Sequence, residues 1–122
     1  MPRTEITVKD VGERYPVLPL VANAHDFSFT VGDAVNGMAF KATGREVVIF
    51  NNINAAAQNA KIVSVVDAFN RTGDLGNYSL GANEFAVFAP PLAGFQQSDG
   101  MIYIDVGHAD VKVAVLKLPS MV

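Results

Sequence analysis

Short apolar segments of strand length, separated by turn-forming residues, recur along almost the whole chain. They are rich in Val, Ile and Phe and end at Gly, Asn, Asp or Pro, residue types favoured in strands and in turns respectively. No amphipathic helical pattern lies between them, which favours a sandwich or barrel over a parallel sheet. We predict an all-β fold, an antiparallel β-sandwich of about eight strands with a jelly-roll-like arrangement.

The turn signals also predict which strands pair. Thr43-Gly44 and Gly81-Ala82-Asn83 are expected to close hairpins, because short Gly- and Asn-containing connections join antiparallel neighbours. Residues 47–50 are apolar without alternation, which is typical of a strand covered on both faces. The expected strands are residues 4–8, 27–31, 37–42, 46–50, 61–66, 78–80, 84–88, 101–106 and 110–118.

Most phenylalanines fall in phase with the alternation of these strands. Because alternate residues of a strand face the same side, rings in this phase are expected to pack in the core. An aromatic platform for single-stranded nucleic acid is the alternative that we set aside. The phenylalanines concerned are Phe27, Phe29, Phe40, Phe50, Phe85 and Phe88.

The segment from Asp10 to His25 is apolar but interrupted by prolines, so it cannot form a central strand. We predict an extended N-terminal arm over residues 1–26 and a sandwich domain over residues 27–122. The arm and a second Pro-rich loop are candidate contacts with neighbouring subunits, and the alternative is that both cover the open ends of their own sandwich. The candidate contact residues are Tyr15, Pro16, Val17, Leu18, Leu20, Val21, Pro90, Pro91, Leu92 and Phe95.

The chain has an unusually small share of charged residues for its size. Its 122 residues, enough for one domain, are 50% hydrophobic and 17% charged, whereas an average soluble domain has about 25% charged residues. We therefore expect some of its surface to contact another protein. A spanning helix is not expected, since no apolar run approaches the roughly 18 residues required. A net charge of −3 argues against nucleic acid as a partner.

Catalytic, cofactor and metal sites are not predicted. The chain has no cysteine, which excludes disulfides and thiolate chemistry. His25 and His108 are expected to be exposed loop side chains. The polar loop from Asp67 to Asn77 carries oxygen ligands that calcium would accept, but turn formation accounts for its Asp, Asn and Gly residues. With no visible signal peptide, we expect the chain to be made in the cytoplasm.

The last two-thirds of the chain resembles small virion proteins of tailed bacteriophages. The resemblance rests on Gly-Arg-Glu-Val-Val-Ile-Phe-Asn-Asn from residue 44, Ile-Val-Ser-Val-Val-Asp-Ala-Phe-Asn-Arg-Thr-Gly-Asp from residue 62, Phe-Ala-Val-Phe-Ala-Pro-Pro from residue 85 and Val-Lys-Val-Ala-Val-Leu-Lys-Leu-Pro from residue 111. Such proteins are commonly capsid decoration, or cement, proteins that assemble on the outside of the head, often as trimers.

This resemblance implies a structural role in the virion and no site residues. The expected partners are further copies of the chain, as a homotrimer, and the phage major capsid protein. The alternatives are a head-completion or tail component, a small carbohydrate-binding module and, last, a small β-barrel enzyme. Sugar binding is disfavoured because Trp is absent and only three Tyr are present, and sugars usually stack on exposed aromatic rings.

Overall fold

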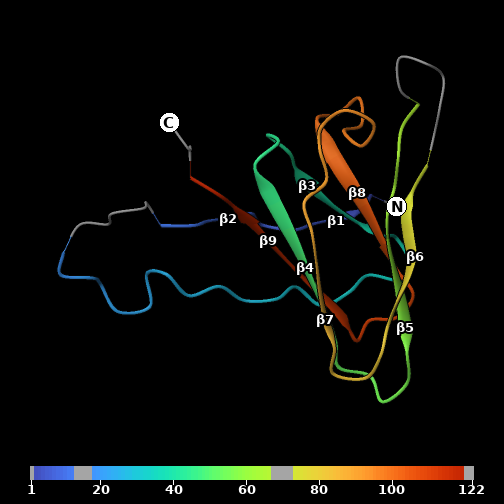
Figure 1. The fold of residues 1–122 in the computed structure, drawn as a ribbon, viewed down its shortest axis with the longest axis horizontal. Helices are drawn as coiled ribbons and strands as arrows, with labels where there is room; N and C mark the ends of the chain where they lie inside the picture. Colours follow the sequence, from blue (N-terminus) through green and yellow to red (C-terminus); the bar gives the residue numbers. More distant parts are fainter. Residues whose placement is uncertain (1, 13–17, 67–72, 120–122) are drawn as a thin grey trace.

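The computed structural model describes residues 2–12, 18–66 and 73–119. Within these residues the chain is all-β, with strands in two sheets that face each other as a sandwich-like pair of layers (Figure 1). The all-β prediction is confirmed. The strands are β1 (Thr4–Glu5), β2 (Lys9–Asp10), β3 (Met38–Lys41), β4 (Glu46–Asn52), β5 (Gln58–Ile62), β6 (Leu75–Leu80), β7 (Phe85–Phe88), β8 (Met101–Val106) and β9 (Val111–Lys117).

Both sheets are mixed, so the prediction of a purely antiparallel sandwich is wrong in this respect. The five-stranded sheet has the order β1-β3-β8-β5-β6 and the four-stranded sheet the order β2-β9-β4-β7. The two short N-terminal strands make the parallel pairs, β1 with β3 and β2 with β9. The other ladders are antiparallel, and three of them are nested in sequence: β3 with β8, β4 with β7, and β5 with β6.

The two predicted hairpins are wrong, because each short turn leads from one sheet to the other. β3 lies in the five-stranded sheet and β4 in the four-stranded one, and the same holds for β6 and β7. The turn between β8 and β9 also changes sheets. These turns are arches over the edge of the core, so the strands on either side of each turn face one another across the core.

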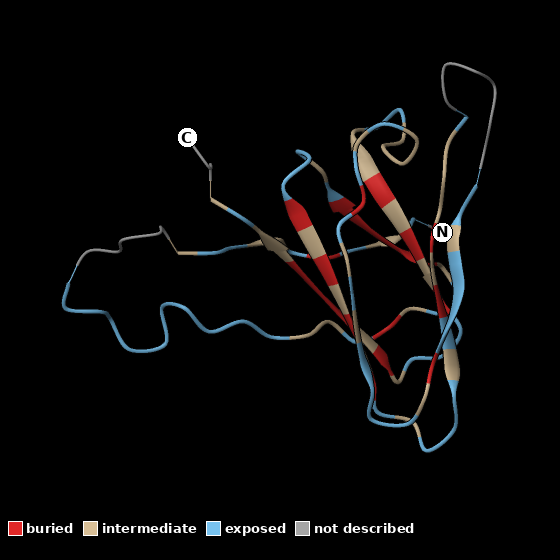
Figure 2. Cartoon of the chain, in the orientation of Figure 1, coloured by how far each residue is buried: buried red, intermediate tan, exposed pale blue. Residues whose placement is uncertain are grey.

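The core lies between the two sheets and contains alternate residues of the central strands (Figure 2). In β4 the buried and half-buried positions alternate strictly, as expected when one face of a strand points inward. The prediction that residues 47–50 are covered on both faces is therefore wrong, because only Val48 and Phe50 are fully buried. The core cluster consists of Ile6, Met38, Phe40, Val48, Phe50, Ala60, Ile62, Leu80, Ile102, Ile104, Val106, Val111, Val113 and Val115.

The phenylalanines divide into core and surface residues. Phe40 and Phe50 are fully buried, and Phe88 packs against the core with its ring 5.8 Å from that of Phe50. Phe27 and Phe85, however, are 46% and 63% exposed, so their assignment to the core is wrong. The predicted strand at residues 27–31 is reduced to a single bridge between Thr30 and Val113.

Residues 4–10 belong to the sandwich. β1 and β2 each add a strand to one sheet, and Ile6 between them is only 2% exposed. A terminal arm made of the whole of residues 1–26 is therefore not confirmed. The described parts of the chain contain no helix that is long and apolar enough to cross a membrane.

Candidate functional site

The outer face of the four-stranded sheet is apolar. In β4, β7 and β9 the residues that alternate with the core positions point away from the core. Phe85 and Val87 on β7 are 63% and 62% exposed, and Val47, Ile49 and Leu116 are half-buried. We call this surface the apolar face; its outward residues are Val47, Ile49, Asn51, Phe85, Val87, Lys112, Ala114 and Leu116.

The outer face of the five-stranded sheet is polar by contrast. Arg3 pairs with Asp105 at 2.7 Å, and Lys61 lies 3.9 Å from Asp105 and 3.7 Å from Asp74. The Arg3 guanidinium also lies 4.3 Å from the centre of the Tyr103 ring. This network of charges suits a surface that faces water, whereas the apolar face does not.

Aromatic rings extend the apolar face beyond its strands. The ring of Phe29 lies 6.3 Å from that of Phe85, and Phe27 lies 5.7 Å from Phe29 in an edge-to-face arrangement. Phe29 comes from the segment that joins β9 at Thr30, and Phe85 comes from β7 at the opposite edge of the sheet. One end of the apolar face is thus covered by residues of the chain's own N-terminal third.

The segment that carries these rings is a long excursion with both ends on one strand. It departs after β2, which pairs with Leu116 and Lys117 of β9, and returns at Thr30, which pairs with Val113 of the same strand. We call its described residues 18–29 the projecting loop, because they extend outward from the sheets (Figure 1). Residues 18–28 are all exposed.

Contacts near the base fix the two limbs of the excursion to each other. The Nζ of Lys9 donates to the carbonyl of Ala24 at 2.9 Å. The ring of His25 lies so close to Gly12 that a Cβ at Gly12 would collide with it. The loop is therefore held by its own chain at its base, although its apolar side chains point into solvent.

The predicted contact residues fall into two groups. Leu18, Leu20 and Val21 are 63%, 55% and 74% exposed on the projecting loop. In the second segment Pro90 is buried and Pro91 is exposed, which favours the alternative that this loop covers its own sandwich. Leu92 is half-buried and Phe95 packs against the core cluster. Tyr15, Pro16 and Val17 lie outside the described residues.

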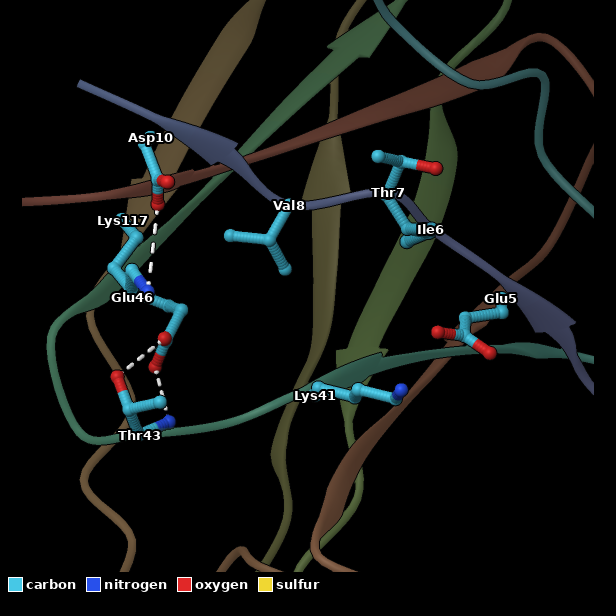
Figure 3. A pocket seen from close by; sticks show the side chains of 9 residues that line it. All are labelled: Glu5, Ile6, Thr7, Val8, Asp10, Lys41, Thr43, Glu46 and Lys117. Atoms are coloured by element: carbon cyan, nitrogen blue, oxygen red, sulfur yellow. Dashed lines mark hydrogen bonds and ion pairs between the residues drawn. The ribbon is translucent and has the colours of Figure 1, made fainter. Parts of the chain in front are cut away.

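A groove of about 430 Å³ lies where the chain crosses from β1 to β2, at an open end of the sandwich (Figure 3). Two of its charged groups pair with each other: Lys117 lies 3.4 Å from Asp10. The Thr43 hydroxyl donates to Glu46 at 2.6 Å. Its lining residues are Glu5, Ile6, Thr7, Val8, Asp10, Lys41, Thr43, Glu46 and Lys117.

The Glu46 carboxylate caps the turn between β3 and β4. Its side chain accepts hydrogen bonds from the backbone N–H groups of Thr43 and Gly44, at 2.8 and 3.0 Å, besides the Thr43 hydroxyl. Burial by itself raises the pKa of Glu46, but these hydrogen bonds outweigh it and hold the pKa below its ordinary value. The Thr43–Glu46 contacts thus hold the turn between β3 and β4 in place.

His108 contacts Asp110 in the turn between β8 and β9: its Nδ1 accepts from the backbone N–H of Asp110 at 3.0 Å and lies 3.6 Å from the carboxylate. His25 and His108 are exposed, as predicted. Hydrogen bonds from the backbone N–H and hydroxyl of Ser64 lower the pKa of Asp74, so this carboxylate already has partners in the fold. Most of the polar loop from Asp67 to Asn77, residues 67–72, lies outside the described residues. Elsewhere in the described chain, no group of three or more His, Cys, Asp or Glu residues is placed to hold a metal ion.

The apolar face does not follow from the sequence pattern. Alternation predicts a core position for Phe85, and the apolar run predicts a strand covered on both sides at Val47 and Ile49. The signal was the unbroken apolar run at residues 47–50, which correctly indicates that both faces of β4 are apolar. One of these faces is buried in the core, and the other is covered only in part within the chain: Ala114 on it is 2% exposed, whereas Phe85 and Val87 are 63% and 62% exposed.

Comparison with known proteins adds no assignment. No protein-family model, no curated protein and no solved structure matches this chain.

Proposed function

We propose that this chain is a structural protein of a phage particle, a capsid decoration or cement protein that binds the outer head surface and stabilises contacts between capsid subunits. The observation that carries the proposal is the pair of uncovered apolar surfaces, the apolar face and the projecting loop. Exposed apolar area of this kind marks a contact with other proteins. A cement protein needs such contacts and a rigid body, and the two packed sheets provide the rigid body.

Two finer structural features belong to the same proposal. The nested antiparallel pairs β3·β8, β4·β7 and β5·β6 support a jelly-roll-like sandwich, to which the N-terminal strands are added at the edges. The projecting loop takes the role that the sequence analysis gave to an N-terminal arm. The protein assembles as a homotrimer, and its second partner is the major capsid protein.

Sedimentation with capsids of the phage that encodes the chain tests this function. Purified protein is mixed with expanded and unexpanded heads that lack it, and the pellets are compared with those of a Leu20→Asp/Val21→Asp variant. Ser79→Asp, an exposed change on β6, is the matched control. We expect the wild type and the control to sediment with heads and to raise the temperature at which the shell opens.

The location of the bound protein separates this proposal from its closest alternative. Electron microscopy of bound heads should show the protein over the whole shell, at three-fold positions. Density confined to one vertex or to the tail would make the chain a head-completion or tail component. Failure to sediment with either form of the head would contradict a role on the capsid.

A carbohydrate-binding module is the second candidate, and one observation favours it. Phe27 and Phe85 are exposed and Phe29 lies between them in a continuous row of rings, and aromatic rings of this kind can stack on sugars. Calorimetric titration with glycans tests it: saturable binding that is lost in Phe85→Ala would favour this candidate over the structural role.

A further inference from the structure

We propose that residues 18–21 of the projecting loop of one copy pack on the apolar face of a second copy, in a head-to-tail contact. This inference deepens the proposed function, because it names the surfaces through which the subunits join. Four features of the described chain support this contact: the composition of β4, the position of Phe29, the anchoring of the loop, and the charges on the two surfaces.

β4 is built to be covered on both faces. Val48 and Phe50 are fully buried in the core, while Val47 and Ile49 on the other face are only half-buried. A strand with one face in water normally alternates apolar and polar residues. The outward side of β4 lacks this alternation at residues 47 and 49, so a cover from outside the chain fits the sequence better than water does.

The chain itself shows how part of this cover is made. Phe29 of the excursion packs toward Phe85 at one end of the apolar face. Beside this contact, Val87 is 62% exposed and Ile49, its cross-strand neighbour, is half-buried. The same excursion carries a second apolar block at residues 18–21. An extended segment with that block can continue the cover that Phe29 begins.

The anchors of the loop direct that block to another copy. Both ends of the excursion are bonded to β9, the strand next to the edge strand β2, and Lys9 ties the returning limb to the outgoing one. The loop extends away from the sheets (Figure 1). Leu18, Leu20 and Val21 stay more than half exposed, so their own apolar face does not cover them.

The charges of the two surfaces are complementary. Among the outward residues of the apolar face, all of them described, Lys112 alone is charged. Between residues 18 and 29, Asp26 is the only carboxylate, and there is no Lys or Arg. A loop docked on a second copy therefore brings opposite charges to the contact, which favours this orientation over a loop-to-loop or face-to-face pair.

A contact between two different surfaces has a consequence for assembly. Head-to-tail contacts generate a closed ring when the rotation between subunits divides a full turn, and an open chain when it does not. A homotrimer would be such a ring, with each copy donating one loop and accepting another.

Crosslinking between two single-cysteine variants tests the contact, because the natural chain has no cysteine. Full-length Val21→Cys and Val87→Cys proteins are mixed in solution without capsids and treated with a short bis-maleimide. We expect crosslinked pairs at about tenfold the yield obtained when Val21→Cys is mixed with Ser79→Cys, a ratio that corresponds to about 1.4 kcal/mol of preference between sites.

Intramolecular crosslinking and light scattering provide two further tests of the contact between copies. A Val21→Cys/Val87→Cys double variant, diluted before treatment, should crosslink between chains and not within one chain; a product within one chain would place the loop on its own face. In light scattering, Leu20→Asp/Val21→Asp and Val87→Asp should each lose the multimer seen for the wild type and for Ser79→Asp. Mixing the two apolar-surface variants should recover a dimer, because one intact loop and one intact face are then present.

These outcomes are separate from those of the capsid experiment. A wild-type chain that is monomeric at all concentrations, or equal crosslinking to Val87→Cys and Ser79→Cys, overturns the head-to-tail contact whether or not heads are bound. Head-to-tail crosslinking without sedimentation on heads would retain the contact and overturn the cement role.

Discussion

The side-chain amide of Asn52 donates a hydrogen bond to the backbone carbonyl of Leu80 at 2.9 Å and thereby joins the two sheets. Asn52 ends β4 in the four-stranded sheet, and Leu80 ends β6 in the five-stranded sheet. The same Nδ2 lies within bonding distance of the carbonyls of Ala56 and Gly81, and Oδ1 accepts from the N–H of Asn54. One fully buried side chain thus holds the arches at one end of the sandwich.

Asn52→Ala should destabilise the protein by about 3 kcal/mol, because it leaves buried carbonyl and N–H groups without partners. Asn51→Ala is the matched control, because Asn51, the neighbour of Asn52, is half-buried on the outward side of β4. This substitution should change the free energy of unfolding by less than about 1 kcal/mol. Urea unfolding at one fixed protein concentration measures both. Equal effects of the two substitutions would contradict the role of Asn52 as a link between sheets.

Gly32 should be intolerant of any side chain. It is buried where the excursion turns into the five-stranded sheet, and a Cβ there would collide with the carbonyl of Val111 and lie 2.9 Å from that of His108. We expect Gly32→Ala to cost about 1–3 kcal/mol, the usual range for overpacking. Thermal unfolding of the purified variant measures the loss.

Gly107→Ala provides the comparison for Gly32. A Cβ at Gly107 would make only ordinary contacts, at 3.5 Å from backbone atoms of Asn59. That variant should be unchanged or up to about 1 kcal/mol more stable, because alanine restricts the unfolded chain. A loss as large as that of Gly32→Ala would show that the cost is a general one for glycines in this part of the fold.

The positions of most strands could be predicted from the sequence, whereas their pairing could not. Alternation placed strands near residues 37–42, 46–50, 84–88, 101–106 and 110–118, all of which contain observed strands. A turn such as Thr43-Gly44, however, is short enough for either a hairpin or an arch between sheets. In the folded chain the turn is an arch, and a buried polar side chain, Glu46, caps it from an inward position.

The candidate site could be read from the sequence only as a hypothesis, for a similar reason. Proline spacing and apolar content indicate Leu18, Leu20 and Val21 as candidate contact residues; they are exposed, and their role as contacts stays a prediction. Alternation predicts a core position for Phe85, but both sides of the strand at residues 85–88 are apolar. The sequence of one strand does not indicate which of its two apolar sides faces inward. The side of β7 that meets the core is decided by its ladder with β4, and that ladder depends on residues distant in sequence.

Ile6→Ala tests whether the N-terminal residues are part of the sandwich. Ile6 is 2% exposed, belongs to the core cluster, and its N–H donates to the carbonyl of Ala39 at 2.8 Å. Truncation of a buried Ile should cost about 2–5 kcal/mol. Val35→Ala, at a position that is 91% exposed, should stay within about 0.5 kcal/mol of the wild type. Chemical denaturation curves that coincide for both variants would show that residues 4–10 are not held in the fold.

Acid should weaken the fold partly through Glu46. Because hydrogen bonds hold the folded pKa of Glu46 below its ordinary value of 4.5, its contribution to stability is fully present above that value. This contribution declines as the pH falls through the folded-state pKa, since the carboxylate must then be protonated. Glu46→Gln removes the titrating group, so its unfolding free energy should depend less on pH below about 4.5.

The size of the Glu46 effect can be separated from the general acid response of the chain. Glu46→Gln also replaces one accepting oxygen with an NH₂ group that cannot accept from Thr43 or Gly44, which should cost about 1–3 kcal/mol at neutral pH. Glu5→Gln, an exposed change at the other side of the same groove, should leave the neutral-pH stability nearly unchanged. Urea unfolding between pH 3 and pH 7, an interval of about four pH units around the ordinary carboxylate range, measures both variants. If Glu46→Gln kept the full acid dependence of the wild type, the prediction for Glu46 would be wrong. The acid sensitivity would then come from the other carboxylates with lowered pKa values, Asp33, Asp74 and Asp99.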